Sequence, residues 1–221
     1  MRRETIAPRP GWQQKLEQLG FDFYVLDSKA YWTEQACYAF TSDQIDELEA
    51  TTEELHGICL KAVEYVVANK LWERMRIPPA WGDYIEREWR RSDPTIVGRF
   101  DLAYDGRNPP KLLEYNADTP TALYEAAVVQ WYWLQERFPN DDQFNSLHER
   151  LVEQWKASGI TTPVHFTSVR HSDEDFATTV YLQDTAAQAG LQTSRYSIRC
   201  SRSRRAGFGW GPASPWGRRA W

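Results

Sequence analysis

Residues 97–120, VGRFDLAYDGRNPPKLLEYNADTP, decide the fold that we expect, because they read as two strands joined by a turn. In the first strand, period-two alternation places Arg99 and Asp101 on one face. In the second strand, Glu114 and Asn116 share a face. The Asp-Gly and Pro-Pro pairs between the strands are typical of a turn. The stretch therefore predicts a β-hairpin with charged and polar side chains on one side.

The register of this hairpin determines which polar side chains face each other. If Tyr104 lies near Lys111 in an antiparallel pair, Asp101 falls opposite Glu114. Two carboxylates that face each other across a ladder repel, and the arrangement is destabilising without a cation between them. The predicted register therefore raises the question of a metal ion at this position.

The residue types on this face suit a hard divalent cation. Mg²⁺ takes one or two carboxylates, and water and substrate phosphates complete its coordination. Asp101, Glu114 and the amide oxygen of Asn116 form a suitable ligand set, and Arg99 could meet a phosphoryl group or a carboxylate with two hydrogen bonds. The alternative is an ordinary exposed face on which Arg99 pairs with both acids in water. The residues leave both interpretations open.

The composition of the chain limits its size class and its partners. Its 221 residues and 42% hydrophobic content are enough for one sizeable core, or for one domain with an appendage. No apolar run is long enough for a membrane span, and the start of the chain lacks the apolar stretch of a secretory signal. The three cysteines show no metal-type spacing, so we expect a cytoplasmic protein with reduced thiols. Residues 1–193 carry 31 acidic residues against 19 basic ones, which disfavours a nucleic-acid partner.

Patterns elsewhere predict a mixed α and β architecture. Residues 41–43, Thr-Ser-Asp, are typical of a helix N-cap, and apolar residues from Ile45 to Val66 follow the spacing of a long amphipathic helix. Residues 122–138 read as a strongly apolar helix. A strand expected at residues 163–169 is followed by a helix to Gly190 and by the start of another strand at Gln192. This order indicates a parallel α/β unit.

Residues 194–221 differ in composition from the rest of the chain. They hold seven arginines and no acid, with Ser, Gly, Pro and Trp but without apolar periodicity. We therefore divide the chain into a folded region, residues 1–193, and an aberrant basic tail, residues 194–221. Two interpretations of the tail remain open: a disordered basic segment, or a sequence translated out of frame near residue 194.

A few other residues could take part in chemistry, but each also has a plain structural explanation. Three of the four histidines fit core or surface positions. His171 lies in a loop after a predicted strand, where α/β proteins tend to bind ligands. Glu174 and Asp175 follow it, and they either cap the next helix or hold a cationic amine. No GxGxxG, Walker or nucleophile-elbow motif is present.

Several ordered motifs resemble a known family. RPGWQQKLEQLGFDFY (residues 9–24), YWTEQACYAFTSDQIDELEATTEELH (31–56), GRFDLAYDG (98–106) and PKLLEYNADTPTALYEAA (110–127) are similar to the glutathionylspermidine synthase family. That family includes bacterial homologues of the synthetase domain that lack the amidase domain. The resemblance covers about residues 8–193 and implies a pre-ATP-grasp region of an ATP-grasp carboxylate–amine ligase.

The resemblance also implies a reaction and its substrates. ATP would phosphorylate the glycine carboxylate of glutathione or a related peptide, and an amine such as spermidine would then attack the acyl phosphate to form an amide. ATP and Mg²⁺ would be the co-substrate and the metal cofactor. The expected partners are these small molecules, without nucleic acid or membrane.

The resemblance implies roles for seven residues. Arg99 resembles the catalytic arginine that stabilises the transferring phosphoryl group, and Arg99 and Asp101 would contact the nucleotide. Asp101, Glu114 and Asn116 resemble the magnesium ligands. Thr119 takes the place of a small hydroxyl residue that contacts glutathione, and Glu174 and Asp175 resemble an acidic pair near the polyamine site.

The chain also departs from the family, whose members continue further into a part that holds most of the ATP-grasp fold, the nucleotide-binding lysines and the lid. We therefore expect an incomplete, inactive member of the ligase lineage. The alternative is a non-catalytic remnant domain that binds peptide, polyamine or a partner subunit. A hydrolase that uses Asp101 and Glu114 as an acid–base pair is disfavoured, because nothing in the sequence marks one carboxylate for a raised pKa.

Overall fold

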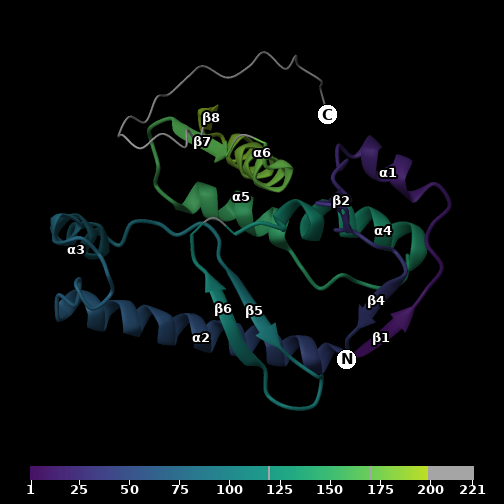
Figure 1. Ribbon diagram of the computed structural model, residues 1–221, viewed down its shortest axis with the longest axis horizontal. Helices are drawn as coiled ribbons and strands as arrows, with labels where there is room; N and C mark the ends of the chain where they lie inside the picture. The colour runs from purple at the N-terminus through teal and green to yellow at the C-terminus, as the bar shows by residue number, and fades with distance from the viewer. Residues whose placement is uncertain (119, 170, 199–221) are drawn as a thin grey trace. The chain divides into compact units, whose positions relative to one another are not determined.

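The structure is a computed structural model that describes residues 1–118, 120–169 and 171–198 (Figure 1). It divides into two compact units. Unit 1 combines Met1–Glu4 with Tyr38–Ala117, and unit 2 combines Thr5–Cys37 with the described residues from Asp118 onward. Helices and small sheets form the chain, so the predicted mixed α/β fold class is confirmed. Among the described helices, none has both the length and the apolar composition that crossing a membrane requires.

Unit 1 is built on one long helix and one hairpin. At the start of the helix, the Thr41 side chain accepts a hydrogen bond from the Gln44 backbone, and the Gln44 side chain accepts one from the Thr41 backbone, so the predicted N-cap is confirmed. In Figure 1 the strands of the hairpin cross this helix at an angle. The elements are α2 (Ser42–Ala68), the 3₁₀ turn η1 (Pro79–Trp81), α3 (Gly82–Arg91), and the hairpin strands β5 (Arg99–Ala103) and β6 (Lys111–Asn116). Strand β1 (Arg2–Thr5) pairs with β4 (Ala36–Ala39).

Helix α2 is more exposed than its amphipathic spacing predicts. Val67 is its buried residue, whereas Ile58 on the expected apolar face is 52% exposed. The hairpin and α3 contact α2, a helix of 27 residues. The predicted long helix is therefore confirmed, and the residues of its apolar face are half-buried or exposed.

Unit 2 contains the parallel α/β unit that the sequence predicts. Strand β7 (Val164–Val169) is followed by α6 (Asp173–Gln188) and by β8 (Thr193–Ile198), and the two strands pair in parallel from Val164↔Thr193 to Val169↔Ile198. Helix α6 ends just before Gly190, whose φ of 92° suits glycine. Strand β8 extends past residue 193, and residues 199–221 of the predicted tail lie outside the described residues, so the division at residue 193 stays a prediction.

The core of unit 2 forms around a cluster of buried side chains. Leu16, Phe21, Phe23 and Val129 are each at most 4% exposed, and aromatic side chains pack around them. Fully burying such a side chain stabilises a fold by about 1.5–3 kcal/mol. The other elements of the unit are α1 (Trp12–Gln18), the paired strands β2 (Val25–Leu26) and β3 (Lys29–Ala30), the π-helical turn η2 (Glu125–Val129), α4 (Gln130–Arg137) and α5 (Leu147–Ala157).

The apolar stretch is helical from residue 123 to residue 137, close to the expected range 122–138, but only one side of it is buried. Val129 is 0% and Leu134 is 5% exposed, whereas Trp131 is 42% exposed. Trp131 therefore lies partly at the surface of unit 2, which corrects the expectation that this apolar helix is largely buried with Trp131 in the core.

Candidate functional site

The hairpin of unit 1 brings the predicted carboxylates face to face. Strands β5 and β6 are antiparallel, and the register pairs Arg99 with Asn116 and Asp101 with Glu114. Residues that pair directly across a ladder point to the same side of the sheet. All four polar side chains therefore share one face of the hairpin, as the alternation of the sequence predicts.

The register changes one residue beyond this set. It shifts between Asp101 and Leu102, so that Ala103, and not Tyr104, pairs with Lys111. The predicted pairing near the turn is therefore wrong by one position, because a bulge inserts Leu113 into β6. The inserted Leu113 is 70% exposed. A bulge of this kind bends and twists a strand locally, and bulges are common next to active sites.

The polar face is partly exposed and already contains one ion pair. The Nε atom of Arg99 donates to Oδ1 of Asp101 over 2.9 Å, and each of these side chains is 37% exposed. Glu114 is exposed and faces Asp101 from the neighbouring strand. The alternative interpretation, an ordinary exposed face, predicts an ion pair between Arg99 and Asp101, and this ion pair is present.

The donor set of this face fits a magnesium ion. The side-chain nitrogen of Asn116 is buried and finds no hydrogen-bond partner among the described residues. Which end of an Asn amide is nitrogen and which is oxygen is normally assigned from its hydrogen bonds. If the two atoms of Asn116 are exchanged, an oxygen occupies the position without a partner, where a cation is a suitable partner. Two carboxylates and one amide oxygen match the preference of Mg²⁺ for oxygen ligands. Within the described ranges, no three His, Cys, Asp or Glu side chains gather as a metal-binding group, and the predicted set contains only two such residues.

The opposite face of the hairpin packs against α2. The rings of Phe100 and Tyr115 stack with centroids 4.0 Å apart, and the Tyr115 hydroxyl and Nδ1 of His56 share a hydrogen bond of 2.9 Å. Burial raises the pKa of Tyr115. Nearer the turn, the Tyr104 hydroxyl donates to Glu47 over 2.6 Å, which raises the pKa of Tyr104 to about 12. These contacts give His56 the structural role that we expected for it, and they hold the strands that carry the polar face.

The three remaining predicted residues belong to unit 2. Thr119 lies outside the described residues. Glu174 and Asp175 lie in the first turn of α6, where Ser172 is the N-cap and its hydroxyl accepts a hydrogen bond of 3.3 Å from the Asp175 backbone. Acids in the first turn interact favourably with the helix dipole, so the capping interpretation of both residues has structural support.

Glu174 also belongs to a polar cluster that the sequence analysis missed. The Tyr31 hydroxyl donates to Oε1 of Glu125 over 2.7 Å, and Glu125 is only 7% exposed. Burial raises the pKa of Glu125, and the nearby carboxylate of Glu174 raises it further. Burial, the hydrogen bond to Glu125 and the charges of Glu125 and Glu174 raise the pKa of Tyr31. The available signal was a single acid, Glu125, inside the apolar stretch LYEAAVV.

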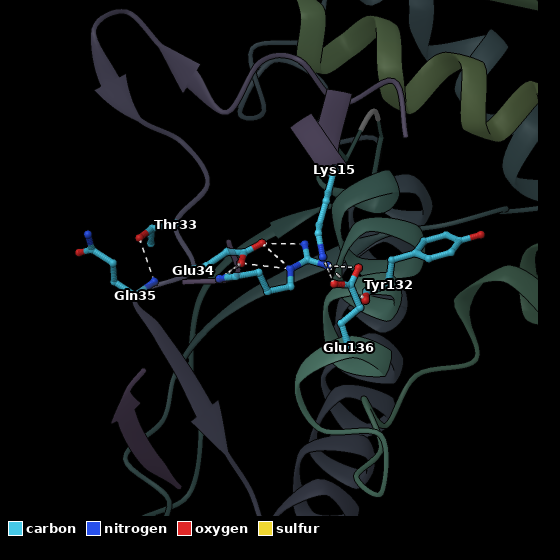
Figure 2. A network of polar contacts seen from close by, with 7 residues as sticks. Lys15, Thr33, Glu34, Gln35, Tyr132 and Glu136 are labelled. Atoms are coloured by element: carbon cyan, nitrogen blue, oxygen red, sulfur yellow. Dashed lines mark hydrogen bonds and ion pairs between the residues drawn. The ribbon is translucent and has the colours of Figure 1, made fainter. Parts of the chain in front are cut away.

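A second missed feature is a buried charge network that joins the start of unit 2 to α4 (Figure 2). The side chains of Arg9 and Glu34 are 3% and 0% exposed, and they form an ion pair of 2.7 Å. Arg9 also contacts Glu136 over 2.9 Å, and Lys15 forms an ion pair with the same carboxylate. Glu34 accepts hydrogen bonds from both the side chain and the backbone N–H of Arg9. These contacts hold the N-terminal segment of unit 2 against α4. None of the residues in this network is a candidate functional residue in the sequence.

Comparisons with known proteins agree with this architecture. Residues 3–205 match the family model "Glutathionylspermidine synthase preATP-grasp". A protein of Haemophilus influenzae named "Putative acid--amine ligase" is 40% identical over 208 residues, which are 90% of this chain and 53% of that protein. The trypanothione synthetase of Crithidia fasciculata is 24% identical over 81% of this chain and 26% of its own length. The bifunctional glutathionylspermidine synthetase/amidase of Escherichia coli is 29% identical over 71% of this chain and 26% of its own length.

The chain thus spans about half the length of one of these relatives and about a quarter of the other two. The family model covers both structural units, including the hairpin with its four polar residues and the α/β unit of β7, α6 and β8. The family and the pre-ATP-grasp fold that the motifs predict are therefore confirmed, and the chain belongs to the glutathionylspermidine synthase preATP-grasp family.

Proposed function

We propose that this chain serves an ATP- and Mg²⁺-dependent carboxylate–amine ligase, which forms an amide between a glutathione-like peptide and a polyamine-like amine through an acyl phosphate. The observation that carries the proposal is the hairpin face of unit 1, where Asp101 lies opposite Glu114 and Arg99 opposite Asn116. The printed names of the relatives, which include an acid–amine ligase and a glutathionylspermidine synthetase, support the same class of reaction.

In this proposal, Asp101, Glu114 and Asn116 hold Mg²⁺, which neutralises phosphate charge when it is bound. Arg99 lies one pleat from Asp101 on the same face, where its guanidinium orients and neutralises the phosphoryl group that is transferred. The Arg99–Asp101 ion pair restricts the orientation of that guanidinium. The stacked Phe100 and Tyr115 keep the two strands in register beneath these groups.

The residues that would contact the substrates are inferred from the family resemblance. Thr119 contacts the peptide, and Glu174 with Asp175 attracts the amine. Of these acids, Glu174 has the better structural support, because its carboxylate raises the pKa values of Tyr31 and Glu125, whereas Asp175 takes part in the N-terminal cap of α6.

A second candidate function is binding without catalysis. The direct Arg99–Asp101 ion pair favours it, because that contact satisfies both charges without a metal ion. In that case the chain binds a peptide, a polyamine or a partner subunit through the same surfaces, and the hairpin does not require nucleotide.

Calorimetric titration of the full chain with ATP and Mg²⁺ separates the two functions. The ligase proposal expects saturable heat that is lost in Asp101→Ala and retained in Asp83→Ala, a control that removes an exposed acid from α3 of the same unit. Amide formation from glutathione, spermidine and ATP is then assayed in the same variants. Equal heat in the wild-type chain and Asp101→Ala contradicts the ligand role of Asp101, and absence of heat in all three supports binding without nucleotide.

A further inference from the structure

The ion pair between Arg99 and Asp101 is close at one end only. The Nε atom of Arg99 donates to Oδ1 of Asp101 over 2.9 Å, whereas the second contact, from Nη2 to Oδ2, is 3.5 Å long. Each of the two side chains is 37% exposed. A hydrogen bond of 3.5 Å is at the long limit, and ion pairs that water reaches contribute little to stability. A cation of higher charge can therefore displace Arg99 from Asp101.

The charges on this hairpin face do not balance. Asp101 and Glu114 pair directly across the two strands, and both lie on the same side of the hairpin as Arg99. Glu114 forms no ion pair with the described residues of the chain, so one guanidinium faces two carboxylates. Like charges directly opposite each other in a ladder are destabilising, and one monovalent cation neutralises only one of the two. The face therefore keeps a negative charge that attracts a divalent cation.

Binding of a divalent cation would change the surroundings of Arg99. Mg²⁺ held by Asp101, Glu114 and Asn116 neutralises both carboxylates and takes the place of the guanidinium at Asp101. Mg²⁺ and the guanidinium then repel each other unless an anion lies between them, and phosphate is the anion that a guanidinium matches with two hydrogen bonds. Conversely, a phosphate group that draws Arg99 away leaves two facing carboxylates, which then bind Mg²⁺ more strongly.

We propose that Arg99 competes with Mg²⁺ for Asp101, so that Mg²⁺ and a phosphate-bearing ligand bind to this face cooperatively and each binds weakly alone. The choice of these two ligands rests on the proposed function, whereas the competition rests on the ion pair and on the facing carboxylates. The cooperativity is reciprocal, because the factor by which phosphate raises the affinity for Mg²⁺ is also the factor by which Mg²⁺ raises the affinity for phosphate. The ion pair and the metal ion are then alternatives at Asp101, and the ion pair is compatible with a ligase.

Calorimetric titration of the full chain with MgCl₂, without nucleotide, tests the competition. We expect Arg99→Gln to bind Mg²⁺ about two- to fivefold more tightly than the wild-type chain, because it removes the competing charge. Arg99→Lys keeps that charge and should stay close to the wild type. Arg91→Gln is the matched control, because Arg91 also forms an ion pair with an acid two positions along unit 1, Asp93, and its loss should leave the Mg²⁺ affinity unchanged. Thermal denaturation shows whether each variant is folded.

The same titration with inorganic phosphate present tests the cooperativity. After correction for the binding of Mg²⁺ to phosphate in buffer, phosphate should raise the affinity of the wild-type chain for Mg²⁺ by about fivefold or more, and it should have no such effect on Arg99→Gln. Four results would overturn the inference: no Mg²⁺ binding to any folded variant, no gain in affinity for Arg99→Gln, an equal gain for Arg91→Gln, or an equal effect of phosphate on Arg99→Gln and the wild-type chain.

Failure of the ligase proposal is visible separately. If Arg99→Gln gains affinity for Mg²⁺ and loses the effect of phosphate while no variant binds ATP with Mg²⁺, the competition at Asp101 stands and the ligase proposal falls. If ATP binds with Mg²⁺ and Asp101→Ala abolishes this binding, but Arg99→Gln gains nothing, the ligase proposal stands and the competition falls.

Discussion

Replacing Glu34 with Gln removes the charge that neutralises the buried guanidinium of Arg9. Both side chains are at most 3% exposed, and Glu34 accepts hydrogen bonds from the backbone N–H, Nε and NH2 of Arg9. Removing one partner of a buried ion pair typically costs about 3–5 kcal/mol, because the other charge stays buried without compensation. Here Glu136 remains as a second partner of Arg9, so we expect a loss at the lower end, about 3 kcal/mol in the free energy of unfolding.

Glu136→Gln is the matched comparison. Glu136 contacts Arg9 and Lys15, but its side chain is 43% exposed, so water compensates the loss of its charge. Exposed ion pairs contribute about 0.2–1 kcal/mol, and we expect a loss of that size. The network in Figure 2 thus predicts that two Glu→Gln changes around one arginine differ severalfold in cost.

Urea unfolding followed by tryptophan fluorescence and far-UV circular dichroism measures both values. The paired replacement Arg9→Met with Glu34→Leu adds a further test, because exchanging a whole buried ion pair for apolar residues is often nearly neutral. The double variant should therefore be more stable than Glu34→Gln alone. A loss below about 1 kcal/mol for Glu34→Gln, or equal losses for Glu34→Gln and Glu136→Gln, would refute the reasoning from burial.

Two further predictions concern the hairpin and the buried acid. Tyr115→Phe removes the hydrogen bond to His56 but keeps the stack on Phe100, so we expect the free energy of unfolding in urea to fall by about 0.5–1.5 kcal/mol. His56→Gln should lower it by less, because the amide can still form a hydrogen bond with the Tyr115 hydroxyl. Burial raises the pKa of Glu125 above its ordinary value of 4.5, so the folded chain holds that proton more tightly than the unfolded chain. The stabilising contribution of Glu125 is therefore complete below about pH 4.5 and is lost as the pH rises through the folded pKa, and Glu125→Gln should flatten this part of the dependence of the urea midpoint on pH. An unchanged pH dependence would show that Glu125 is already ionised in the fold at no cost.

The candidate site on the hairpin could be predicted because it depends on local alternation. Arg99 and Asp101 lie two positions apart, and so do Glu114 and Asn116, so any antiparallel pairing in the correct parity places them on one face. The same holds for β7, α6 and β8, whose periods and caps lie within one continuous stretch of chain. The bulge at Leu113 could not be predicted, because it changes the register only near the turn and leaves the polar pairs as they were.

The sequence by itself therefore determined the family, the mixed α/β class, the polar hairpin face and the parallel α/β unit. The family follows from the order of its sequence motifs, and the other three depend on spacings of two to four residues, which a chain displays before it folds. Only the tertiary structure decided that Glu125 meets Tyr31 and lies near Glu174, and that Arg9 and Glu34 form a buried pair. Those groups are separated by 25 to 94 positions, and only the packing of unit 2 brings them together and removes them from water.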